Sequence, residues 1–290
     1  MTKILNMIKT KSFQIVAASL ALVLCVTGVV WHLATPASAA ELNIGNANVQ
    51  TFAGSRAIEN GKLVGTADSN ATMSVFIRGS GNNKYNGTNI KWTHDGSGWD
   101  SETDVLYEGA NSQQQIYACS PYVDGNTSGI FTVIASEQVD WLVATSQKLT
   151  SSNVNLTMTH ALSKLVITPT LGSEVENMSI AKIEVGGMYA SGDLNIADNS
   201  WSNRGTANAT LEVKNNELLV IPMADCTSFD VVVTMEDNRV FTTTVTCPNG
   251  KLEAGTQYNI NLQVGQDKVT IGGITASPWG YASGGVLETE

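Results

Sequence analysis

The residues best suited to chemistry form an acidic cluster within the stretch HDGSGWDSETD. Asp95, Asp100, Glu102 and Asp104 supply carboxylate oxygens, which are the ligands that Ca²⁺ prefers. Their spacing misses the calcium-loop pattern, in which a central glycine separates the first ligands from a distal glutamate. We therefore expect a solvated polar loop here rather than a metal site.

Catalytic side chains are scarce in the rest of the chain, which has three histidines in all. His160 falls on the apolar side of an alternating stretch, where a hydrogen-bonded core histidine is the usual role. Motifs of serine hydrolases, zinc proteases, dithiol proteins and phosphate-binding loops are missing from the sequence. A catalytic carboxylate pair stays open, because 26 acidic residues bring some together by chance, but no spacing selects one. We predict a non-enzymatic protein without a cofactor.

The first 39 residues have the features of a signal peptide. Three lysines precede an apolar run over 14–31, and small residues close the segment at Ala39. We predict a signal peptide over 1–39, cleaved after Ala39, and hence an exported protein. A retained membrane anchor is the alternative, since the apolar run is long. Cys25 follows Leu-Val-Leu rather than a small residue, which disfavours a lipoprotein signal.

Removal of this leader leaves 13 basic and 26 acidic residues, a net charge of −13. Such a surface disfavours nucleic acid and anionic membranes as partners. Three cysteines remain, namely Cys119, Cys226 and Cys247. Export permits disulfides, and Cys226 with Cys247 is the pair that we expect to join neighbouring strands, if one forms. One cysteine is then left over.

The segment from Glu41 to Arg56 combines scattered apolar residues with Asn and Gly, and it reads as one extended, weakly specified strand. It ends in small residues around a lone arginine. The bond between Arg56 and Ala57 is therefore a candidate site for a trypsin-like protease, and an uncut polar loop is the alternative.

Apolar residues alternate along most of the remaining chain, which predicts an all-β protein. The central stretch is Asn153–Thr168. Leu156 and Met158 share one face, and the apolar set shifts to the other parity at Leu165 and Ile167. Because a slip of one residue exchanges the faces of a strand, we expect one long strand near a domain junction, with a bulge or sharp twist near Ser163 that passes it from one core to another.

Similar alternation and turn signals predict about seven short strands in each half, arranged as two β-sandwiches over 40–168 and 169–290. The segments 229–235 and 240–246 read as a hairpin. In contrast, 191–208 reads as a long surface loop. Trp99 and Trp201 stand in polar stretches, where exposed indoles stack on sugar rings, and this motivates an alternative function as a surface adhesin or glycan-binding protein.

Several ordered stretches resemble the fimbrillin family of Bacteroidales, the FimA and Mfa-like pilins. The most specific is VDWLVA followed by VNLTMTHALSKL, which is similar to the family's core motif. The others are SRA with the strand at 73–77, YACSPY at 117–122, and LEAGTQY at 252–258 followed by the segment at 274–279. The resemblance covers almost all of the chain beyond the leader.

This resemblance implies two consecutive transthyretin-like β-sandwich domains and a role as a subunit of cell-surface fimbriae at the outer membrane. It further implies polymerisation by donor-strand exchange with other fimbrillin subunits. A trypsin-like protease removes the N-terminal strand, and the match places that cut at Arg56. Adhesion to a host protein or glycan is implied as a contribution of the fimbria.

Within this resemblance the candidate donor strand is the tail 267–290, which follows the strand predicted over 255–264. Its proposed anchors are Val269, Ile271, Ile274 and Trp279. The alternative is that residues 269–279 complete the chain's own sandwich.

Overall fold

The computed structural model describes residues 40–49, 58–59, 62–63, 71–79, 81–95 and 98–279. Strands dominate this part of the chain, with three short 3₁₀ helices at Asn83–Tyr85, Ala135–Glu137 and Pro248–Gly250. The predicted all-β fold is confirmed. Across these residues no helix is long and apolar enough to cross a membrane. The predicted processing residues Ala39, Arg56 and Ala57 lie outside the described ranges.

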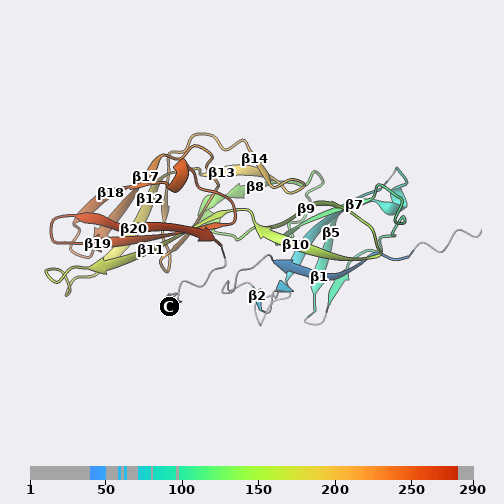
Figure 1. Ribbon diagram of the computed structural model, residues 1–290, viewed down its shortest axis with the longest axis horizontal. Coiled ribbons are helices and arrows are strands. Elements are labelled where there is room, and N and C mark those ends of the chain that lie inside the picture. Colours follow the sequence, from blue (N-terminus) through green and yellow to red (C-terminus); the bar gives the residue numbers. More distant parts are fainter. Residues whose placement is uncertain are drawn as a thin grey trace, which may run out of the picture. The chain divides into compact units, whose positions relative to one another are not determined.

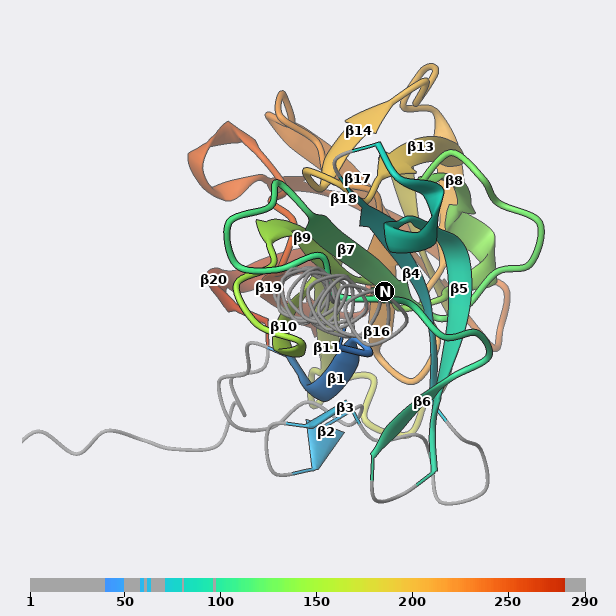
Figure 2. The same ribbon diagram turned by 90° about the vertical axis from the view of Figure 1, so that its right-hand side faces the viewer.

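A seven-stranded sheet organises the N-terminal half (Figures 1 and 2). Its two edge strands, β1 and β6, lie in contact, so the sheet curls around the buried side chains that we call the first core. The predicted strand face of Met73, Val75 and Ile77 belongs to this core. In sheet order, the strands are β1 (Asn43–Val49), β10 (Asn153–His160), β9 (Leu142–Lys148), β7 (Gln115–Ser120), β4 (Thr72–Arg78), β5 (Gly87–His94) and β6 (Trp99–Ser101).

Three further sheets enclose the second core, and a two-stranded ribbon of β2 (Ile58–Glu59) and β3 (Lys62–Leu63) stands apart from them. One sheet has the order β16 (Glu217–Val220), β11 (Ser163–Leu171), β19 (Thr256–Val264) and β20 (Val269–Pro278). Another has the order β15 (Ala209–Glu212), β12 (Ile180–Met188), β17 (Ser228–Met235) and β18 (Val240–Thr246). The third has the order β14 (Ser200–Ser202), β13 (Ser191–Asn195) and β8 (Ile130–Ile134).

The chain passes from the first core to the second between β10 and β11. Leu156 and Met158 are buried in the first core, whereas Leu165 and Ile167 are buried in the second. The expected change of core near Ser163 is therefore confirmed. The expectation of one long strand is wrong, because β10 ends at His160 and β11 begins at Ser163 in a different sheet. Both cores lie in one compact unit that starts at Glu41. The division into domains 40–168 and 169–290 stays a prediction.

The prediction of a long loop over 191–208 is wrong, because β13 and β14 form a hairpin there. Its polar residues conceal the fully buried Leu194 in β13 and the fully buried Ile196 in the turn that follows. Pairing with β8, far away in the sequence, stabilises this hairpin. Asn199 has a φ of 57° in the connecting turn, a conformation that asparagine tolerates better than most residues. The polar composition of 191–208 did not reveal this hairpin, because few of its positions are buried.

One edge of the β20-containing sheet is capped by a side chain. The amide of Gln138 donates to the Leu219 carbonyl at 2.9 Å and accepts from the Leu219 N–H at 2.8 Å. These are the bonds that a neighbouring strand would otherwise make to β16. Capping of this kind protects an edge from pairing with another chain. Strand β20 forms the opposite edge of the same sheet.

Candidate functional site

Strand β1 lies parallel to β10 at the edge of the seven-stranded sheet. The amides of Leu42 and Asn43 donate to the carbonyls of Val105 and Ser152, each at 2.7 Å, and fix the entry to the strand. Leu42, Ile44 and Ala47 are all buried in the first core. The predicted extended strand therefore forms, and it contributes both backbone pairing and apolar side chains.

Strand β10 depends on β1 for most of its pairing. Its register with β9 covers only Thr159 and His160, because the two strands diverge beyond that point. From Asn153 to Met158, the described ladder partners of β10 all belong to β1. Loss of β1 would expose this length of backbone and open an apolar slot beside Leu156 and Met158.

The order of the sequence connects this edge to the predicted cleavage site. Arg56 and Ala57 follow β1, and the next strand of the large sheet, β4, begins at Thr72. A cut after Arg56 therefore breaks the only covalent link between β1 and the sheet to which it is paired. After such a cut, β1 would be retained by non-covalent contacts alone.

The predicted donor segment forms β20 and is paired with β19 of the same chain, from Val264 with Val269 to Thr256 with Pro278. The structure thus places these residues in the chain's own sheet, as in the alternative considered above. Val269 and Trp279 are buried at the two ends. Ile271 and Ile274 are only partly buried against the second core. The backbone hydrogen bonds to β19 and the buried side chains of Val269 and Trp279 therefore hold β20 in place.

Trp279 fixes the C-terminal end of β20 through contacts that the sequence did not reveal. Its ring stacks on that of His160, with centroids 3.7 Å apart and an interplanar angle of 13°. The backbone N–H of Trp279 donates to the carbonyl of Gly255 at 2.7 Å. Lys164 Nζ lies 5.7 Å from the ring centroid and 2.7 Å from a carboxylate oxygen of Glu217. The last residue of β10 thereby contacts the end of β20.

His160 is buried, as expected for a core histidine, and its Nδ1 lies 2.9 Å from Asp140 Oδ1. That distance places the proton on Nδ1, which donates to the carboxylate. On the other side of the ring, Nε2 is buried and has no hydrogen-bond partner among the described residues. The expected hydrogen bonding of a core histidine is therefore found at Nδ1 and not at Nε2.

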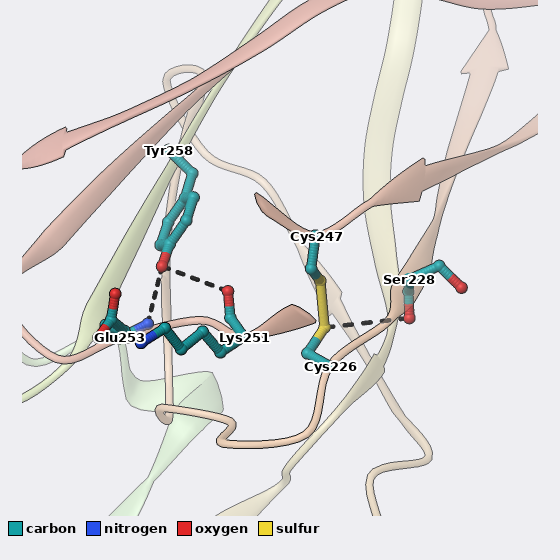
Figure 3. Close-up of a disulfide and its surroundings, with 6 residues drawn as sticks. All are labelled: Cys226, Ser228, Cys247, Lys251, Glu253 and Tyr258. Carbon is teal, nitrogen blue, oxygen red and sulfur yellow. Dashed lines mark hydrogen bonds and ion pairs between the residues drawn. A yellow bond between two sulfur atoms is a disulfide. The ribbon is translucent and has the colours of Figure 1, made fainter. Parts of the chain in front are cut away.

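Cys226 and Cys247, the pair expected from the sequence, are joined by a disulfide with a Cα–Cα distance of 6.0 Å (Figure 3). The bond ties the segment before β17 to the end of β18. Nearby, the Tyr258 hydroxyl accepts from the Glu253 N–H at 2.8 Å and holds the turn before β19. Burial raises the pKa of Tyr258 above its ordinary value.

The two tryptophans that motivated the glycan-binding alternative differ in exposure. Trp99 is 5% exposed and lies in the first core, so its assignment to an exposed loop is wrong. It packs edge-on to His94, with ring centroids 5.2 Å apart. Trp201 is partly buried against the second core and lines a pocket of about 440 Å³ with Arg204 and Lys251. Burial thus removes Trp99 from the glycan-binding alternative, whereas Trp201 keeps a partly exposed ring.

Comparison with known proteins agrees with this architecture. A candidate cell adhesion protein from Bacteroides ovatus superposes with a TM-score of 0.66 at 15% identity, covering 83% of this chain and 98% of that one. Another from Bacteroides uniformis gives a TM-score of 0.60 at 17% identity, covering 82% and 99%. At these identities the likeness establishes a shared fold. No curated protein matches the chain.

The sequence profile of the fimbrillin-like family matches residues 55–279. That range includes every strand of the second core and all of the first except β1. It begins next to the predicted cleavage site and ends at the tryptophan that stacks on His160. The chain therefore belongs to the fimbrillin-like family.

Proposed function

We propose that this protein is a polymerising subunit of cell-surface fimbriae, and that cleavage after Arg56 by a trypsin-like protease triggers its assembly. The observation that carries the proposal is the position of β1, which pairs with β10 at a sheet edge and precedes that arginine. Cleavage would convert β1 into a removable peptide. The exposed edge of β10 would then accept a strand from another copy or from a related subunit.

Membership of the fimbrillin-like family gives the chain a structural or adhesive role in fimbriae at the cell surface, and not an enzymatic one. The finer steps proposed here, the cut and the exchange of strands, rest on the edge geometry. The named cell adhesion proteins with the same fold are consistent with an adhesive contribution of the fimbria.

The physical basis is the free energy of an unpaired strand edge. Removal of β1 would take the apolar side chains of Leu42 and Ile44 away from the first core. Each such side chain contributes about 1.5–3 kcal/mol when fully buried. It would also leave backbone groups of β10 without protein partners. A strand donated by another subunit restores the apolar burial and the backbone hydrogen bonds along its whole length, which favours assembly.

We propose the C-terminal tail 267–290 as the donor, with Val269, Ile271, Ile274 and Trp279 as its anchors. In the free chain β20 pairs with β19, so donation requires it to exchange this ladder for one on the next subunit. Because β20 is an edge strand in which most residues after Val269 are exposed or partly exposed, it detaches at lower cost than a central strand.

Trypsin treatment of the full-length protein tests this function. We expect cleavage after Arg56, followed by a ladder of oligomers on size-exclusion chromatography and filaments by negative-stain microscopy. Arg56→Ala combined with Lys62→Ala, which removes both trypsin sites between β1 and β4, should prevent both, whereas Arg56→Lys should preserve both because trypsin also cuts after lysine. A product that is cut at residue 56, has lost β1 and stays monomeric would overturn the proposal.

A further inference from the structure

A pocket of about 330 Å³ lies where the end of β10, the end of β20 and the turn between β13 and β14 meet. It is lined by His160, Trp279, Thr159 and Asn199, with small and apolar residues completing the wall. Its volume is at the lower end of the range for small-molecule sites, about 300–1,000 Å³. The pocket is half open to solvent, so a ligand can reach it in the folded monomer.

Two buried polar atoms on the pocket-lining residues lack hydrogen-bond partners in the described part of the chain, His160 Nε2 and Asn199 Oδ1. His160 is only 3% exposed, so leaving its second nitrogen unpaired carries a desolvation cost. Asp140 occupies Nδ1, so Nε2 is the ring nitrogen that a ligand with a hydroxyl group could pair with. Buried polar groups usually have partners, and these two atoms therefore point to a ligand.

The lining also fixes the charge of that ligand. No Asp, Glu, Lys or Arg side chain lines the pocket. Asp140 accepts from His160, and Lys164 pairs with Glu217. A charged ligand would lose its hydration without gaining a counter-ion, which is unfavourable. The site therefore selects a neutral molecule.

We propose that this pocket binds one uncharged sugar ring through its hydroxyl groups. A hydroxyl both donates and accepts, so it can satisfy His160 Nε2 and either orientation of the Asn199 amide. The Trp279 and Pro278 walls supply the apolar contact that the carbon face of a sugar needs. The site is complete in a single chain, so binding does not depend on polymerisation.

Saturation-transfer NMR on the uncleaved full-length protein tests this site, with D-galactose, D-mannose, D-glucose and N-acetyl-D-glucosamine as probes. We expect saturable binding of at least one of them. Asn199→Gly, which suits the positive φ at this position, should weaken that binding about tenfold, the loss expected for one hydrogen bond in a desolvated site. Asn216→Gly is the matched control, because Asn216 also has a positive φ and does not line the pocket.

His160→Phe provides a second variant, since it preserves an aromatic ring against Trp279 and removes Nε2. It should abolish binding, and if it fails to fold, Asn199→Gly alone decides. The proposal is overturned if no neutral sugar binds saturably, which would indicate a site for water only. It is also overturned if glucosamine or glucuronate binds more tightly than the neutral sugars, or if Asn199→Gly has no effect. Because the monomer is tested, none of these results depends on strand exchange.

Discussion

Cys119 shows how burial controls the chemistry of a single side chain in this fold. It lies on β7 in the second core and is fully buried. Loss of solvation raises the pKa of its thiol to about 12, which outweighs the opposing hydrogen bond from Ser74. The folded chain therefore keeps the thiol protonated where an unfolded chain would ionise it. Its contribution to the free energy of unfolding is complete below about pH 9 and is lost as the pH rises towards 12.

Alkylation tests this assignment together with the disulfide. At pH 8 the folded protein should leave Cys119 unmodified by iodoacetamide, because the reactive thiolate is suppressed and the side chain is inaccessible. In denaturant without reductant Cys119 should react, while Cys226 and Cys247 should react only after reduction. Peptide mass spectrometry measures each site separately. Rapid labelling of Cys119 in the folded chain would contradict its burial.

Strands with regular alternation could be predicted from the sequence, and those that depend on distant partners could not. The shift of apolar parity between Met158 and Leu165 located the junction of β10 and β11, because burial on opposite faces leaves a local signal. The hairpin of β13 and β14 escaped prediction because β8 supplies its pairing. The contact between His160 and Trp279 joins two strands that are distant in sequence, and no local pattern marks it.

At the scale of elements, Trp279 should determine how firmly β20 is held. Trp279→Ala removes the stack on His160 and leaves a cavity at the end of the strand, and truncation of a buried tryptophan costs about 3–5 kcal/mol. We expect faster amide hydrogen exchange from Thr275 to Ser277, with little change in β18. Val240→Ala is the control, because Val240 is 59% exposed. Unchanged exchange in β20 would show that its backbone ladder alone retains it.

For the whole molecule, the edge strands β16, β1 and β20 have unequal roles. The β16 edge is capped by Gln138, whereas β1 and β20 occupy the outer positions of their sheets. β1 precedes the predicted cleavage site, and β20 leads into the C-terminal tail. An assembly that exchanges strands needs a removable strand and a donated one, and these two elements meet that requirement. With the predicted leader removed, the net charge would be −13, and repulsion would then oppose association of uncut subunits.

Locking β1 to β10 tests the central claim, that assembly requires β1 to leave its edge, most directly. Asn43 and Asn153 are exposed partners in the parallel register, so a disulfide between Asn43→Cys and Asn153→Cys would hold the strand without altering the core. We predict that trypsin still cuts after Arg56, that light scattering shows only monomers, and that a reductant then releases polymerisation. The unmodified protein with and without reductant, and each single variant, are the controls. Polymers that form while the engineered disulfide remains intact would contradict the account.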